Sequence, residues 1–116
     1  MSLSEQIRIF LKNFNDKKKI WEILFRDDRG KNAQTLLQLE IRPFEREKII
    51  DSVIVEDYSE GPLEDKLNQS ADMWVFGKIY KGKMIYIKIA MGLPINPVIC
   101  ISFHEAEYKM KFPLKK

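Results

Sequence analysis

The spacing of apolar residues changes along the chain, from a helical period in the first half to a strand-like one after residue 72. Near the start, four apolar residues fall at i, i+3, i+4 and i+7: Ile7, Phe10, Leu11 and Phe14. This spacing predicts a short amphipathic helix over about residues 3–14. The polar run 15–19 is expected to end that helix.

The middle of the chain predicts one strand, two further helices and a loop. Residues 20–25 alternate between two faces, as a strand does. Asn32 is a suitable cap for a helix over about 33–39, and Pro43 suits the first turn of a third helix. Residues 57–65 contain Gly61-Pro62 and are expected to form a loop.

The two middle helices should each have a dry and a wet face. The inward residues expected in the second helix are Ala33, Leu36 and Leu37. The solvent-facing residues expected in the third helix are Glu45, Arg46, Glu47 and Lys48.

The second half of the chain predicts a sheet. Period-two alternation places strands near 73–80, 84–91 and 97–103, and the tail is expected to add a short edge strand ending at Pro113. Because helices come first and strands later, we expect an α+β fold with N-terminal helices packed on a curved antiparallel sheet. The length of 116 residues fits a single domain, residues 1–116.

The strand near 84–91 has one clearly apolar face. Ile85, Ile87 and Ile89 alternate with Tyr86 and Lys88, so the two sets point to opposite sides of the sheet. The isoleucines are expected to face the core, which places Tyr86 and Lys88 on the other face.

The face of the preceding strand depends on the length of the hairpin loop. A two-residue turn at Lys81-Gly82 would put Trp74 and Phe76 in the core with the isoleucines. A three-residue loop would swap the faces and put Trp74, Phe76 and Lys78 beside Tyr86. We favour the three-residue loop, because a tight two-residue turn needs a positive φ at Lys81.

Composition excludes several classes of protein. The apolar runs are too short to span a membrane, and residues 1–14 have no signal-peptide pattern. The single cysteine, Cys100, is expected to be a small buried hydrophobe and fits a reducing cytoplasm. One cysteine and one histidine cannot form a zinc cage, and the glycines form no phosphate-binding motif, so no metal or cofactor is expected.

Charge is unevenly distributed, although the net charge is only +3. The acidic segment 56–72 precedes a basic hairpin that has four lysines and no acid between residues 78 and 88. Aromatic residues interleaved with lysines are typical of surfaces that hold single-stranded nucleic acid. The candidates for RNA binding in and near this hairpin are Trp74, Phe76, Lys66, Lys81 and Lys83. The alternative is that helices cover the aromatics and that the lysines are solvated.

Several segments between Lys31 and Glu105 resemble the MqsR-type toxins, which are messenger-RNA interferases with a RelE-like fold. The matching segments are TLLQLEIRPFEREKIIDSV, DYSEGPLED, MWVFGK, YIKI and CISFHEAE. In that family an aspartate-aromatic-serine segment precedes a tryptophan strand, and a Tyr-hydrophobic-Lys-Ile strand follows. The resemblance implies a RelE-like fold, ribonuclease activity on RNA and neutralisation by a cognate antitoxin protein.

The resemblance assigns the catalytic residues of the family only in part. It places the active-site tyrosine at Tyr86. The family's catalytic glutamine follows the tryptophan, where this chain has Val75. Its catalytic lysine has no aligned counterpart, and Lys66 and Lys78 are the nearest replacements.

Cleavage of RNA without a metal uses the 2′-OH of the substrate as nucleophile. The site must remove that proton, stabilise charge on the phosphorane oxygens and protonate the leaving 5′ oxygen. Lys78 and Lys88 are candidates for the charge, and Tyr86 for positioning or proton transfer. His104 titrates in the useful range, although a structural or solvent-exposed role is the alternative.

Two functions from different classes therefore remain. The first is a toxin endoribonuclease of a type II toxin-antitoxin pair. The second is a non-catalytic protein- or RNA-binding module of the same fold.

Overall fold

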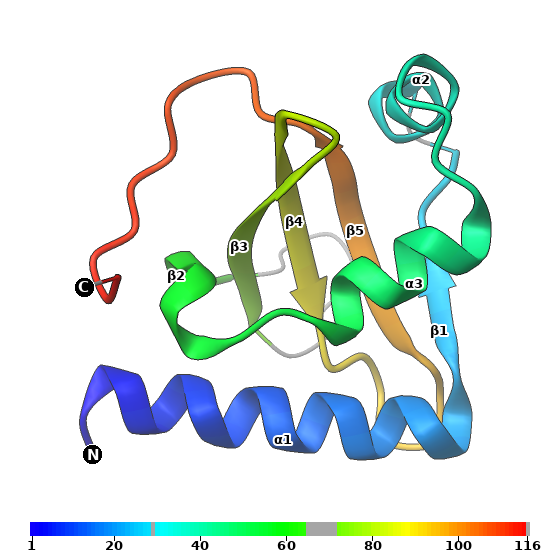
Figure 1. Cartoon of the computed structure of the whole chain (residues 1–116). Helices are drawn as coiled ribbons and strands as arrows, with labels where there is room; N and C mark the ends of the chain where they lie inside the picture. Colours follow the sequence, from blue (N-terminus) through cyan, green and yellow to red (C-terminus); the bar gives the residue numbers. More distant parts are fainter. Residues whose placement is uncertain (29, 65–71, 116) are drawn as a thin grey trace.

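The computed structural model describes residues 1–28, 30–64 and 72–115. It confirms the expected α+β class, with an N-terminal helix packed on an open, curved sheet of five strands (Figure 1). The helices are α1 (Leu3–Trp21), α2 (Gly30–Gln38) and α3 (Pro43–Asp51), with a 3₁₀ turn η1 (Val55–Asp57). The strands are β1 (Ile23–Phe25), β2 (Tyr58–Leu63), β3 (Met73–Tyr80), β4 (Lys83–Ala90) and β5 (Val98–Glu105).

The sheet has the strand order β1-β5-β4-β3-β2 and is mixed. Strands β2 to β5 pair antiparallel, but β1 pairs parallel with β5. The expected wholly antiparallel sheet is therefore wrong at this one edge. β1 enters from α1 at the end of the sheet where β5 also begins, and both strands then run in the same direction (Figure 1).

Helix α1 continues well beyond the predicted end at residue 14. Its polar half is stabilised by an ion pair one turn apart between Lys12 and Asp16, at 2.8 Å. Lys18 and Lys19 lie in the last turn, where cations interact favourably with the helix dipole. The helix ends where Glu22 takes a positive φ of 68°, so the strand expected at 20–25 is only Ile23–Phe25.

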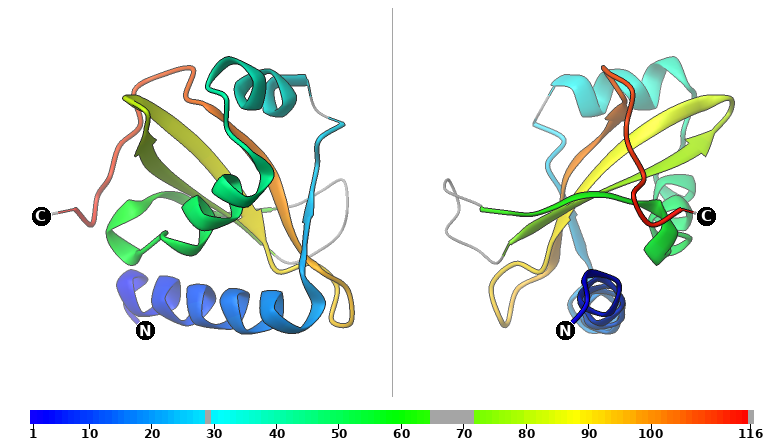
Figure 2. Two further views of the ribbon diagram at one scale, coloured as in Figure 1. Left: turned by 45° about the vertical axis from the view of Figure 1, so that its right-hand side comes forward. Right: turned by 90° about the vertical axis from the view of Figure 1, so that its left-hand side faces the viewer.

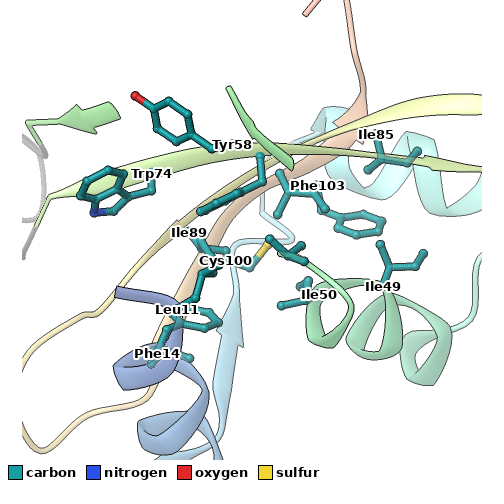
Figure 3. Close-up of a cluster of buried hydrophobic side chains, with 14 of the residues drawn as sticks. Leu11, Phe14, Ile49, Ile50, Tyr58, Trp74, Ile85, Ile89, Cys100 and Phe103 are labelled. Carbon is teal, nitrogen blue, oxygen red and sulfur yellow. The ribbon is translucent and has the colours of Figure 1, made fainter. Parts of the chain in front are cut away.

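The core lies on the face of the sheet covered by α1 and α3 (Figure 3). As predicted, Ile85, Ile87 and Ile89 are buried there, together with Phe14 and Phe103. Burying each such side chain contributes on the order of 1.5–3 kcal/mol. We call this the core face of the sheet and the opposite side the outer face.

The hairpin between β3 and β4 has a two-residue turn, so the favoured three-residue loop is wrong. Trp74 pairs with Ile89 and Phe76 pairs with Ile87, which puts both aromatic rings in the core. Lys81 takes a positive φ of 51° in this turn. Its Nζ donates to the carbonyl oxygens of Leu39 and Glu40, at 2.8 and 2.9 Å, at the end of α2. These contacts offset the strained backbone of a lysine in a left-handed conformation.

Two further expectations about loops and tail are corrected. Residues 58–63 of the expected loop form the edge strand β2, which pairs with β3 through a shifted register. The tail forms no strand within residues 106–115. It instead runs down the β3 side of the sheet, where Met110 is buried (Figures 1 and 2).

The middle helices also turn different faces inward from those predicted. Asn32 lies inside α2 rather than capping it, and Asn32 and Thr35 are its buried residues, while Leu37 is 80% exposed. Arg46 of α3 was expected on the wet face but is buried. In both helices a buried polar side chain has specific partners in the sheet or its loops, and these partners determine the orientation of the helix.

Candidate functional site

The outer face of β4 and β5 carries a row of polar side chains. Tyr86 and Lys88 project from β4, opposite the core isoleucines, as predicted. Across the ladder Tyr86 pairs with His104 and Lys88 pairs with Ser102, so all four side chains share this face. The alternation of β4 and the antiparallel register with β5 together bring Tyr86, Lys88 and His104 to one place.

These residues line an open pocket of about 380 Å³. The N-terminal turn of α2 forms one wall, β4 and β5 form the floor, and the segment after β5 forms the other wall. The lining residues are Gly30, Lys31, Asn32, Tyr86, Lys88, Ser102, His104, Glu107 and Tyr108. We call this the polar pocket.

Aromatic contacts organise the floor of the polar pocket. The rings of Tyr86 and His104 are stacked, with centroids 5.1 Å apart and planes at 11°. Tyr108 meets Tyr86 edge-on at 6.3 Å, and Lys88 Nζ lies 5.8 Å from the centre of the Tyr86 ring. The lysine is close enough for a cation–π interaction, so the site places a cation beside a phenol.

His104 is held in a defined tautomer. Its Nδ1 lies 3.0 Å from the carbonyl oxygen of Glu105. Because a carbonyl oxygen only accepts, this hydrogen bond requires the proton on Nδ1. Nε2 of the neutral ring is then left as the nitrogen that can accept a proton, as a general base needs.

The rim of the polar pocket carries both signs of charge. Lys31 Nζ and Glu107 Oε1 form an ion pair at 2.7 Å across the opening. The hydrogen bond from Lys31 holds the pKa of the Glu107 carboxyl below its usual value. Tyr108 donates to Glu60 of β2 at 3.1 Å, and burial raises the pKa of its hydroxyl. The segment after β5 is thus tied to α2 on one side and to β2 on the other.

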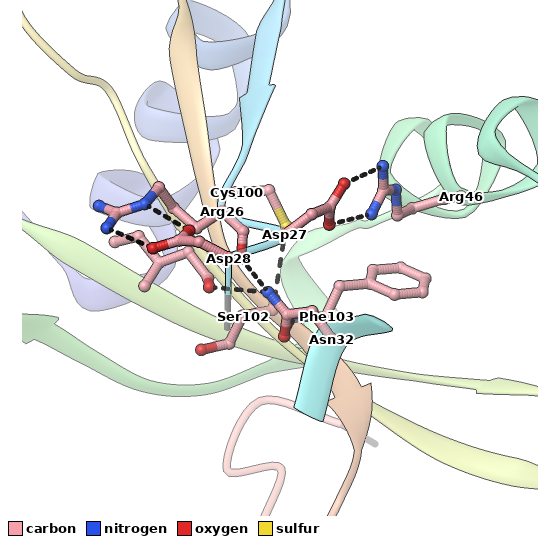
Figure 4. A network of polar contacts seen from close by, with 9 residues as sticks. Arg26, Asp27, Asp28, Asn32, Arg46, Cys100, Ser102 and Phe103 are labelled. Carbon is pink, nitrogen blue, oxygen red and sulfur yellow. Dashed lines mark hydrogen bonds and ion pairs between the residues drawn. The ribbon is translucent and has the colours of Figure 1, made fainter. Parts of the chain in front are cut away.

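Helix α2 is fixed against β5 by buried hydrogen bonds (Figure 4). The Asn32 side-chain amide donates to the carbonyl oxygens of Arg26 and Ile101, at 3.0 and 3.1 Å, and its oxygen accepts from the Phe103 N–H at 3.0 Å. Thr35 Oγ1 accepts from the Glu105 N–H at 3.0 Å. These bonds satisfy backbone groups of β5 beyond its pairing with β1 and position Lys31 at the pocket.

A partly buried ion pair supports the loop that leads into α2. Arg46 donates to both carboxylate oxygens of Asp27, at 2.7 and 3.2 Å (Figure 4), and its guanidinium lies 3.5 Å from the centre of the Phe25 ring. Cys100 lies nearby in β5, and burial raises the pKa of its thiol to about 12. As expected from the sequence, this cysteine is a buried hydrophobe and not a nucleophile.

The structure separates Lys78 from the other candidates. The two-residue turn puts Lys78 opposite Ile85, and its Nζ donates to Asp57 at 3.0 Å and to the Ser52 carbonyl oxygen at 3.3 Å. Lys78 therefore leaves the site, and its predicted role beside Tyr86 is wrong.

The remaining RNA-binding candidates do not line the polar pocket. Trp74 and Phe76 are buried in the core, so they cannot stack on a base. Lys81 is bound to the end of α2, and Lys83 is exposed at the start of β4. Lys66 lies outside the described residues.

Lys31, Glu107 and Tyr108 are pocket residues that the sequence analysis missed. Their places depend on how α2 and the tail fold back onto β5, which no local pattern reveals. Val75, at the position of the glutamine in MqsR-type toxins, does face outward beside Lys88 but is fully buried and brings no polar group.

Comparison of the chain with protein-family models, with curated proteins and with solved structures gives no match. Among the described residues, no group of three or more histidine, cysteine, aspartate or glutamate side chains is placed to hold a metal ion. No helix in the described ranges is long and apolar enough to cross a membrane. The fold and site therefore define an α+β protein with a polar, partly cationic pocket on the outer face of a mixed sheet.

Proposed function

We propose that the protein is an endoribonuclease toxin of a type II toxin-antitoxin pair, with a RelE-like fold and a metal-independent mechanism. One observation carries the proposal. Tyr86, Lys88 and His104 come from two neighbouring strands and line a single open pocket on the outer face. Such a pocket offers a proton acceptor, a hydroxyl and a cation within reach of one phosphodiester.

In the proposed reaction, His104 Nε2 takes the proton of the 2′-OH, and the 2′ oxygen attacks phosphorus. The bond from phosphorus to the 5′ oxygen breaks, and the Tyr86 hydroxyl gives that oxygen a proton. Lys88, beside the Tyr86 ring, stabilises both the phosphorane and the phenolate that forms. The products are a 2′,3′-cyclic phosphate and a free 5′-OH, and water then restores the protonation of both side chains.

The second candidate is a non-catalytic module that binds RNA or protein. It is favoured by Val75, which supplies no amide where MqsR-type toxins have their glutamine. It is also favoured by the burial of Trp74 and Phe76, because the expected stacking face does not exist.

The two candidates differ in one direct assay. Purified protein is incubated with a mixed-sequence RNA in a chelating buffer, and the new ends are analysed. We expect 2′,3′-cyclic phosphate ends from the wild type and about 10²- to 10⁴-fold slower cleavage by His104→Ala. Intact RNA that still binds to the protein would favour the module and contradict the nuclease.

The proposed toxin function also predicts the substrate, the partner protein and the cellular location. The protein should act on messenger RNA in the cytoplasm and be neutralised by an antitoxin protein. A neighbouring reading frame encoding a small protein that binds this chain and blocks cleavage would support the pair.

A further inference from the structure

The segment after β5 alternates between an inner and an outer row of side chains. Met110 is buried, and Phe112 and Leu114 are half-buried against the rest of the protein. Lys109, Lys111 and Lys115, which flank these apolar residues in the sequence, are exposed. Residues 109–115 therefore form an extended segment, which we call the strap. Its apolar side chains pack against the rest of the protein, and its lysines are exposed to solvent.

The strap is seated directly on β3. A Cβ at Gly77 would lie 2.7 Å from the Phe112 ring and 3.1 Å from Met110 Sδ. Only a glycine at this position of β3 allows the strap to approach so closely. The lysine row is thus attached to the rigid sheet and not to a free tail.

Seating the strap creates a second hollow, of about 340 Å³, beside the polar pocket. Met84, Met110 and Phe112 give it largely apolar walls, and Lys109 lies at its lining. Tyr108 lines both this hollow and the polar pocket, so the two adjoin at this side chain. Glu105 also lines the hollow.

We propose that this hollow is a second subsite for single-stranded RNA, resting on the function proposed above. It takes the base of a nucleotide that neighbours the phosphate held in the polar pocket, and Lys109 and Lys111 bind the backbone phosphates that follow. A nucleotide has a flat, largely apolar base and an anionic phosphate. The hollow matches both, because its wall is aromatic and methionine-lined and a lysine lies beside it. Stacking of this kind tolerates any base.

The lysine row is tested by the salt dependence of binding. The probes are 2′-deoxyuridine oligonucleotides from a dinucleotide to a hexanucleotide, which lack the 2′-OH and cannot be cleaved. The variant is Lys109→Gln/Lys111→Gln, and the matched control is Lys12→Gln/Lys19→Gln on α1, which removes the same charge from a distant surface. For the hexanucleotide, we expect the negative slope of log affinity against log salt to become shallower by about 1.4 in the variant, at about 0.7 per lost phosphate contact. The control should keep the wild-type slope, and the dinucleotide should show no difference.

The base subsite is tested by removing either the Phe112 ring from the protein or the bases from the probe. Phe112→Leu should weaken hexanucleotide binding about 5- to 100-fold. Because Phe112 also packs against Gly77, the melting temperature of the variant is measured in parallel. A fully abasic hexanucleotide, which keeps its phosphates but has no bases, should bind wild type and Phe112→Leu equally. An equal loss on both probes would show that the variant acts on folding and would overturn the subsite.

Other outcomes separate this inference from the proposed function. If the wild type binds and cleaves RNA but neither variant changes affinity, the subsite is wrong and the nuclease stands. If the wild type binds no oligonucleotide, both fail. If Phe112→Leu instead abolishes binding of an antitoxin while leaving RNA affinity unchanged, the hollow is a peptide-binding site and the inference is overturned.

Discussion

The ring of Tyr86 lies flat against the ring of His104, with centroids 5.1 Å apart and an angle of 11° between the planes. The two residues are direct cross-strand partners on β4 and β5. Because His104 is also held through Nδ1, the stack and the hydrogen bond together limit rotation of the imidazole. This arrangement keeps Nε2 oriented before any substrate arrives.

The ring of Tyr86, which stacks on His104, and its hydroxyl can be tested separately by substitution. Tyr86→Phe keeps the ring and loses only the hydroxyl, and Lys88→Ala removes the nearby cation. Under the proposed function, we expect expression of the wild type without a partner to inhibit growth, and the double substitution to relieve that inhibition. Loss of one charge-assisted contact in the transition state should cost about 1.5–3 kcal/mol, roughly ten- to a hundredfold in rate.

The measurement is growth after induction, with messenger-RNA integrity followed in parallel. Circular dichroism and thermal melting are the controls for folding, since neither residue belongs to the core. If expression of the wild type leaves both growth and messenger RNA unaffected, the toxin proposal is wrong.

Lys78 should be dispensable for the proposed chemistry. It lies on the core side of β3 near the turn to β4 and pairs with Asp57, so Lys78→Met should leave the cleavage rate unchanged. The half-buried carboxylate loses its partner, and we expect the free energy of unfolding to fall by about 1 kcal/mol. The cleavage assay in chelating buffer measures the rate, and urea titration measures the free energy of unfolding. A large loss of rate at full stability would return Lys78 to the site.

The Asp27–Arg46 pair should respond asymmetrically to substitution. Asp27→Asn leaves a buried guanidinium without its counter-charge, whereas Arg46→Met leaves a carboxylate that is 47% exposed and can be hydrated. We therefore expect Asp27→Asn to be the more destabilising, by about 2–3 kcal/mol against about 1–2 kcal/mol. Urea unfolding of both single variants and the double variant gives the comparison. The reverse order would mean that packing of Arg46 on Phe25 outweighs its charge.

Cys100 should give stability a dependence on alkaline pH. Burial raises the pKa of the thiol from 9.0 to about 12, so the folded chain keeps a proton that the unfolded chain loses. The unfolded state binds fewer protons in this range, and stability should therefore fall as pH rises from about 9 towards 12. Cys100→Ala removes this contribution, so the stability gap between wild type and variant should narrow above pH 9. A constant gap from pH 7 to 11 would contradict the buried, protonated thiol.

Local alternation was sufficient to predict the faces of β4 and hence part of the site. Three isoleucines at period two leave only one face for Tyr86 and Lys88, whatever the rest of the fold does. His104 was a candidate because of its chemistry, and its place beside Tyr86 depends on the register between β4 and β5. Tyr86 and Lys88 could be predicted since their orientation depends on neighbours one or two positions away.

Long-range contacts account for the predictions that failed. Lys81 accepts a positive φ because its side chain reaches carbonyl oxygens about 40 residues away, at 2.8 and 2.9 Å. Arg46 is buried because Asp27 lies opposite it, and Lys31 joins the pocket because Asn32 binds β5. Each of these depends on a partner that the local pattern does not identify.

The position of β5 in the sheet has a consequence for the order in which the protein is made. Its residues pair with β1, hold Asn32 across 71 positions of sequence and supply His104 to the pocket. During synthesis α1, β1 and α2 therefore leave the ribosome before the strand that completes their contacts. Until residues 98–105 emerge, the polar pocket has no His104 and α2 has no anchor. Under the proposed function, a growing chain would stay harmless to the message from which it is being translated.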